Sequence, residues 1–151
     1  MSEFVKLAHR VADLERRMRG ICRFGTVGEV DPAAGTVRLK LGEGADGAPY
    51  LSAPIPYAQT AGAVSFHNPP SVGQQMMAVS PDGDLRQAVA QPMGFSEAQG
   101  SPGSAGDTHV MTFGSVSITM AGDSLVITVG GSTVTIGSGA VSIVAPRIDL
   151  N

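Results

Sequence analysis

Residues 114–144 read GSVSITMAGDSLVITVGGSTVTIGSGAVSIV, a stretch in which glycine returns every eight residues, at Gly114, Gly122 and Gly130. Between the glycines, apolar residues alternate with Ser and Thr, which is typical of β-strands with one buried face. The glycine phase slips in the fourth block, where Gly137 and Gly139 straddle the expected position. A fixed period marks a repeat architecture. The sequence therefore predicts a run of short strands built on an eight-residue repeat.

This repeat cannot bury its apolar side chains within one chain. Each strand offers two or three of them, and the sequence leaves no helix or second sheet to cover them. A single-layer meander is marginal in water, and its free edges favour aggregation. Three chains wound together with the apolar rows inward would remove both problems. A solenoid or adhesin-like stalk, or a stack against another protein, is the alternative. We predict an intertwined, triple-stranded β-helix of a homotrimer over residues 110–151, with a core of Val116, Ile118, Met120, Leu125, Ile127, Val129, Val134, Ile136, Val141, Ile143, Ile148 and Leu150.

The first segment, residues 1–21, carries a heptad pattern that predicts an N-terminal helix. With Phe4 at position a of the heptad, Arg10 falls at g and Glu15 at e, where they can pair between parallel helices. Gly20 lies where such a helix would end. Because a helix of under three heptads is marginal alone, we expect a partner, either copies of itself or a groove. Packing on its own domain is the other interpretation. The predicted seam consists of Phe4, Leu7, Val11, Leu14, Met18 and Ile21.

The second segment, residues 22–96, is expected to be a small antiparallel barrel of the OB type. A turn at 31–35, with Pro and Gly, separates two strand patterns, and a second turn at 81–84 precedes a return strand. The region between the two strand pairs holds many prolines and is predicted to be a long irregular loop, 42–70. The expected strands cover residues 24–30, 36–41, 74–80 and 85–91. A linker rich in Ser, Gly, Ala and Pro follows at 97–109.

The composition argues against several classes of protein. With 15% charged residues, a net charge of −3 and a pI near 5.5, the chain lacks the basic footprint of a nucleic-acid-binding protein. The charged N-terminus does not resemble a signal peptide, and no uncharged apolar run is long enough for a membrane-spanning helix. Cys22 has no partner for a disulfide within the chain, and we interpret it as a buried structural thiol.

No residue pattern indicates catalysis. Asp82 and Asp84 flank Gly83 in a turn, which favours a structural role, and His67 lies in a loop with no carboxylate nearby in sequence. The chain contains no nucleophile-elbow, Walker or metalloprotease motif. We therefore predict a protein that is not an enzyme and that needs no cofactor or metal.

Taken together, four stretches resemble the baseplate assembly protein V family, the small spike proteins of contractile phage tails. They are similar, more distantly, to the spikes of type VI secretion and extracellular contractile injection systems. The resemblance implies a virion tail baseplate protein, or its equivalent in an injection particle, that is assembled in the host cytoplasm. It also implies an OB-fold domain docked to a tail hub protein and a trimeric β-helix that punctures the host outer membrane. The stretches are RVADLERRMRG at 10–20, FGTVGEVDPAAGTVRLKLG at 24–42, PPSVGQQMMAVSPDGDLRQAVA at 69–90 and SIVAPRIDLN at 142–151.

The sequence departs from this family at its C-terminal end. Members with a self-sufficient tip often end in a His-x-His pair that holds iron, whereas His109 here stands alone at the start of the repeat. This departure predicts a blunt spike, sharpened by a separate PAAR-repeat tip protein at Asp149, Leu150 and Asn151. A receptor-binding or structural fibre tip, and an OB-fold module for a ligand or nucleic acid, are the alternative functions.

Overall fold

The structure, a computed structural model, describes residues 2–149 and is mainly β, as the sequence predicts. It contains one N-terminal helix, one short 3-10 turn and two antiparallel sheets. The chain divides into two compact units, Met1–Gly100 and Ser101–Asn151. Helix α1 (Glu3–Ile21) and the first sheet belong to unit 1, and the second sheet makes up unit 2.

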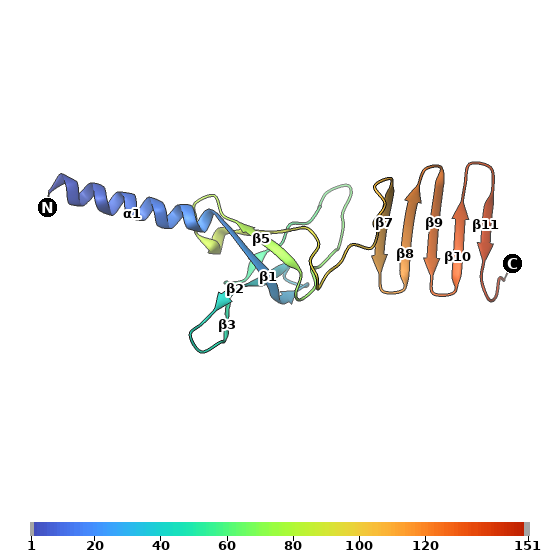
Figure 1. The fold of residues 1–151 in the computed structure, drawn as a ribbon, viewed down its shortest axis with the longest axis horizontal. Helices are drawn as coiled ribbons and strands as arrows, with labels where there is room; N and C mark the ends of the chain where they lie inside the picture. Colours follow the sequence, from blue (N-terminus) through green and yellow to red (C-terminus); the bar gives the residue numbers. More distant parts are fainter. Residues whose placement is uncertain (1, 150–151) are drawn as a thin grey trace. The chain divides into compact units, whose positions relative to one another are not determined.

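Helix α1 begins at a serine cap and runs directly into the first strand. The backbone N–H of Val5 donates to Oγ of Ser2 at 3.4 Å, which satisfies one of the unpaired donors of the first turn. Glu3 in the first turn and Arg19 in the last suit the helix dipole. At the other end Cys22 is already extended, so no loop separates helix from strand. Figure 1 shows the helix projecting away from the strands of its own unit.

Unit 1 is a small curved sheet whose two ends are joined. Its path order is β3-β2-β1-β5-β6, and β4 pairs with β2 beside β3. A parallel bridge joins Tyr57, just after β4, to Ala90 of β6, and the N–H of Ala58 donates to the carbonyl of Ala90 at 2.8 Å. Strands β1, β2, β4, β6 and β5 therefore follow one another in a closed ring of neighbours. The strands are β1 (Cys22–Asp31), β2 (Thr36–Glu43), β3 (Pro49–Leu51), β4 (Ile55–Pro56), β5 (Gln75–Val79) and β6 (Val89–Pro92).

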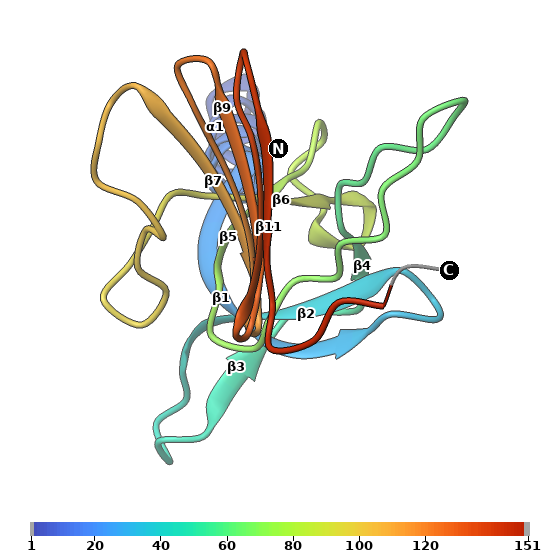
Figure 2. The same ribbon diagram turned by 90° about the vertical axis from the view of Figure 1, so that its right-hand side faces the viewer.

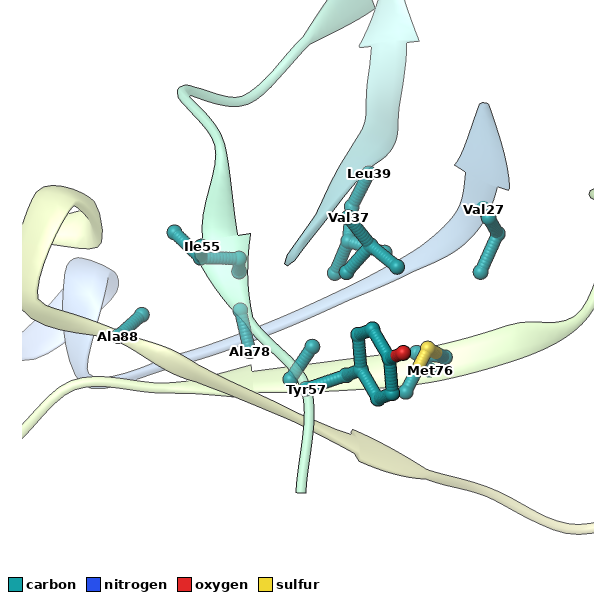
Figure 3. Packing of buried hydrophobic residues seen from close by; sticks show 9 residues of the cluster. Val27, Val37, Leu39, Ile55, Tyr57, Met76, Ala78 and Ala88 are labelled. Atoms are coloured by element: carbon teal, nitrogen blue, oxygen red, sulfur yellow. The ribbon is translucent and has the colours of Figure 1, made fainter. Parts of the chain in front are cut away.

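The buried core of the chain lies inside this ring. In β2, Val37 and Leu39 are buried while their neighbours are half-exposed, so the period-two alternation predicted for this strand is confirmed. Figure 3 shows how side chains from several strands meet there, with the ring of Tyr57 beside Met76. The core consists of Val27, Val37, Leu39, Ile55, Tyr57, Met76, Ala78, Ala88 and Ala90.

Two local predictions for unit 1 are wrong. The region 42–70 is not wholly irregular, because it contains β3 and β4, which are too short to show a period. The return strand begins at Val89 rather than at Leu85, because a 3-10 turn η1 (Leu85–Gln87) comes first. The carboxylate of Asp84 caps this turn by accepting from the N–H of Arg86 at 3.0 Å. An aspartate at this position therefore starts a helical turn instead of a strand.

The helix ends at Ile21, one residue after Gly20, as the sequence predicts, and Gly20 also lets the last turn approach a loop. A Cβ at Gly20 would lie 2.1 Å from the carbonyl oxygen of Gly83, and a Cβ at Gly83 would lie 2.2 Å from that of Arg17. Gly83 also has φ +74, which favours glycine. Next to this contact, the N–H of Ser80 donates to the carbonyl of Ile21 at 2.8 Å. The last helical turn is thereby fixed to the connection between β5 and β6.

Unit 2 is a single five-stranded antiparallel meander in the order β11-β10-β9-β8-β7 (Figure 1). Two residues connect each of the first three strands to the next, and the first of the two is Gly114, Gly122 or Gly130, with φ between +52 and +57. Since the second residue of each pair has no positive φ, these are type II′ turns. Six strand residues plus two turn residues give the eight-residue repeat. The strands are β7 (Thr108–Phe113), β8 (Val116–Ala121), β9 (Ser124–Val129), β10 (Ser132–Ile136) and β11 (Val141–Val144).

The fourth turn of the meander is longer than the others and accounts for the slip in the glycine phase. It spans residues 137–140, and the N–H of Gly137 donates to the carbonyl of Ala140 at 2.9 Å. Upstream of the meander, the predicted linker 97–109 has no helix or strand until β7 begins at Thr108. Figure 2 looks along the sheet and shows β7, β9 and β11 nearly superimposed, so the sheet is close to flat.

Candidate functional site

The first candidate surface is the apolar stripe of α1, which we call the helix seam. It comprises the six predicted seam residues, and all of them are exposed in the chain, with Phe4 at 79% and Met18 at 69%. Among the helix residues that the structure describes, only Gly20 is buried. The interpretation of α1 as a helix packed on its own domain is therefore wrong. The helix touches its unit at its last turn and leaves the seam uncovered.

The second candidate surface is one face of the meander, which we call the apolar face. Residues directly opposite one another in an antiparallel pair share a face, and the strand register aligns Ile118 with Ile127, Ile127 with Val134 and Val134 with Ile143. These residues form a central row across the sheet. The ten predicted core residues that lie in strands all fall on this face: Val116, Ile118, Met120, Leu125, Ile127, Val129, Val134, Ile136, Val141 and Ile143.

The sequence analysis missed three residues of the apolar face and included two outside the strands. His109, Met111 and Phe113 of β7 lie opposite Met120, Ile118 and Val116, so β7 extends each row by one residue. Their own alternation with Val110 and Thr112 is the signal that could have identified them. Ile148 follows β11 in an irregular segment and is exposed, and Leu150 lies outside the described residues.

No residue of unit 2 that the structure describes is buried. Phe113 is 87% exposed, and even Ile118, Ile127 and Val134 in the central row are only partly covered by their neighbours. The opposite face of the same strands is mostly Ser and Thr, at positions such as Ser117, Thr128 and Thr133. A contiguous apolar face of this extent marks an interaction surface.

The charged side chains form local ion pairs rather than a reactive cluster. Asp84 accepts two hydrogen bonds from the guanidinium of Arg86, at 2.8 and 3.1 Å, and these bonds together with the Arg86 backbone N–H lower the pKa of Asp84 to about 2. Within residues 2–149, no group of three or more His, Cys, Asp or Glu side chains is placed to hold a metal ion. Of these pairs, Asp84–Arg86 also caps the 3-10 turn η1.

Three basic side chains of unit 1, Arg38, Lys40 and Arg86, are paired with carboxylates. Nη1 of Arg38 lies 3.2 Å from Oε2 of Glu29, and Nζ of Lys40 lies 2.7 Å from Oε1 of Glu43. Arg86 is held by Asp84 as described above. A surface with its cations neutralised in this way has little net attraction for a polyanion.

The remaining single residues have clear positions. Cys22 is exposed, so its interpretation as a buried thiol is wrong, because α1 does not fold back over the start of β1. Of the predicted tip-contact residues, Asp149 is exposed and accepts a 2.9 Å hydrogen bond from Nε of Arg147. Leu150 and Asn151 lie outside the described residues. The hydroxyl of Tyr57 is buried and finds no partner within the described part of the chain.

No protein-family model matches the chain. A search of curated proteins gives no match either. Over residues 2–149, the structure has no helix with the length and apolar character needed to span a bilayer.

Proposed function

We propose that this protein is the central spike of a contractile tail or injection particle, a homotrimer held together by the apolar face of unit 2. The observation that carries the proposal is a flat, single-layer sheet with an extensive apolar face and no cover from within unit 2. In the proposed trimer, three such sheets form the faces of a triangular β-prism, one face per chain, in place of the intertwined β-helix expected from the repeat, because consecutive strands pair within the chain. The ten predicted core residues that lie in strands, together with Met111 and Phe113 of β7, then face a common axis.

The dimensions of the strands fit a three-sided shaft. A six-residue strand spans about 20 Å, and a triangular prism with sides of that width has its faces about 6 Å from the axis. Packed sheets elsewhere lie about 10 Å apart, so each is about 5 Å from the midplane between them. The central row, with Ile118, Ile127, Val134 and Ile143, is therefore at a suitable distance to fill the axis. Five strands stacked about 4.8 Å apart make a shaft of roughly 19 Å per set.

Flatness favours a prism over a face-to-face dimer. Sheets in a sandwich twist by about −20 to −25° per strand and pack at about −30° to each other. The sheet of unit 2 fans only slightly, as Figure 2 shows, and flat sheets are otherwise unusual without stacking or side-chain ladders. The central row, which runs from Met111 through Ile118, Ile127 and Val134 to Ile143, is such a ladder. A measurement of the molecular mass in solution would distinguish the proposed trimer from a dimeric sandwich.

We propose unit 1 as an OB-fold barrel that docks to the tail hub. A five-stranded, partly open Greek-key barrel is the OB architecture, and the ring of neighbours β1-β2-β4-β6-β5 supports it. Three parts of the proposal rest on the sequence resemblance to baseplate spikes: docking to a hub protein, puncturing of the outer membrane, and a separate PAAR-repeat tip protein. The alternative of nucleic-acid binding is disfavoured by the paired state of Arg38, Lys40 and Arg86.

Co-expression with the products of neighbouring genes, followed by purification of the assembled particle, tests the proposal. We expect three copies of this chain per particle, bound to a hub protein at one end and to a small tip protein at the other. A receptor-binding fibre tip would instead copurify with fibre proteins and leave the hub complete without it. A particle that contracts and injects normally when this chain is deleted would refute the proposed function.

A further inference from the structure

The charged residues of α1 and the position of its seam indicate which partner covers the helix seam. We propose that α1 pairs with the α1 helices of the other copies in a parallel coiled coil, which gives the protein a second association element at its N-terminal end. The number of helices rests on the proposed trimer, whereas the parallel pairing rests on α1 itself. The sequence left two partners open, copies of the helix or a groove on another protein.

The seam is uncovered along its full length and faces away from the point where α1 is held. At 100° per residue, Gly20 lies roughly 130° around the helix from the centre of the seam. The contact with Gly83 is therefore on the far side from Leu14 and Met18, which are 58% and 69% exposed. The barrel fixes the direction of the helix without covering its apolar stripe.

The ion pairs of α1 point to a parallel partner of the same sequence. Within α1, Glu3 pairs with Lys6, and Asp13 pairs with both Arg16 and Arg17. Among residues 2–149, Arg10 and Glu15 take part in no intrachain ion pair.

These two residues occupy the g position of one heptad and the e position of the next, which meet between neighbouring helices when the helices are parallel and in register. An antiparallel pair would instead bring like positions together. Of the three charged α1 residues outside these ion pairs, Arg19 lies at the outward b position, and Arg10 and Glu15 are the two that a parallel copy would pair.

The attachment of α1 to unit 1 gives the coil a structural consequence. Because Ile21 continues directly into Cys22 of β1 and its carbonyl accepts from Ser80, the helix is continuous with the barrel. A coil of α1 helices would therefore set the positions of the barrels around the same axis. The N-terminal ends of the assembly would be joined independently of the meander.

Cross-linking in the full-length protein tests the inference. Leu14→Cys, made with Cys22→Ser to remove the native thiol, places one thiol per chain at a d position next to the axis. His9→Cys in the same background is the matched control, because His9 lies at the outward f position of the same helix. With a short bismaleimide, we expect the Leu14→Cys protein to form covalent dimers about tenfold faster than the control, because adjoining seam positions have a millimolar effective concentration.

Charge exchange in the Leu14→Cys, Cys22→Ser protein tests the orientation. Arg10→Glu and Glu15→Arg should each slow the cross-linking roughly threefold or more, because each brings like charges together, and the double variant should restore the rate. Failure of the double variant to restore it overturns the parallel register.

The molecular mass of the protein in solution distinguishes a failure of this inference from a failure of the proposed function. A trimer in which Leu14→Cys and His9→Cys cross-link equally slowly overturns the coiled coil and leaves the spike intact. A monomer without cross-linking overturns both.

Discussion

Replacing Ile127 by Asp is the strongest single perturbation of the apolar face. Ile127 lies at the centre of the middle strand, paired with Ile118 on one side and Val134 on the other. In the proposed trimer, three copies of the side chain meet at the axis. Loss of their burial costs about 5–9 kcal/mol per trimer, at about 1.5–3 kcal/mol for each side chain. Each buried, unpaired carboxylate adds several kcal/mol more.

We therefore expect Ile127→Asp to be monomeric at micromolar concentration, as measured by sedimentation equilibrium or light scattering. Thr128→Asp is the matched control, because Thr128 is the next residue of the same strand and pairs with Ser117 and Thr133 on the polar face. It adds the same charge and should remain trimeric. An Ile127→Asp protein that sediments as a stable trimer, or a Thr128→Asp protein that dissociates as readily, would refute the inward orientation of this face.

Three further predictions concern the local supports of both units. Gly20→Ala should lower the stability of unit 1 by about 1–3 kcal/mol in urea unfolding, because the new Cβ would lie 2.1 Å from a backbone carbonyl oxygen. Gly42→Ala, which meets no atom within 4 Å, is the control and should have a much smaller effect. Gly122→Ala should destabilise unit 2 by about 1–2 kcal/mol because its φ is +52; a thermal midpoint equal to the wild type would contradict the turn assignment. The pKa of Asp84 is lowered to about 2 from 3.8 by Arg86, so the pair stabilises the fold above about pH 3.8 and this contribution is lost as pH falls toward 2. Asp84→Asn should flatten the dependence of the melting temperature on pH in that window, and an unchanged slope would argue against the pair.

Local patterns in the sequence were sufficient to predict the short strands of unit 2 and their apolar side, but not that these strands pair with one another in a meander. The alternation between glycines assigns Ile118, Ile127 and Val134 to one side of each strand, and the register then aligns them because two-residue turns leave no freedom to slip. The heptad spacing likewise predicts α1. These patterns are strong because each depends on neighbours within a few residues.

Features that depend on contacts distant in sequence were not predictable in the same way. The sequence indicates that the helix ends near Gly20, but it does not indicate that the backbone of Gly20 lies against Gly83, more than sixty residues later. The exposure of Cys22 follows from the direction in which α1 leaves the barrel, which no local pattern encodes. The strands β3 and β4 are three and two residues long, so they carry too few residues to establish an alternation.

The type II′ turns of unit 2 make the length of the meander adjustable in fixed steps. Each unit of six strand residues and two turn residues adds one strand spacing, about 4.8 Å. Residues that face each other across a two-residue turn differ by an odd number in the sequence, as Phe113 and Val116 do, so removing or inserting one unit turns the apolar residues of every following strand to the opposite face. It also reverses the direction of the following strands, so the chain would leave the sheet at the opposite edge. A change of sixteen residues, as in a deletion of 114–129, restores both the face and the exit edge. Evolution or an engineer can therefore lengthen or shorten this part of the molecule by about 10 Å at a time without redesigning its core.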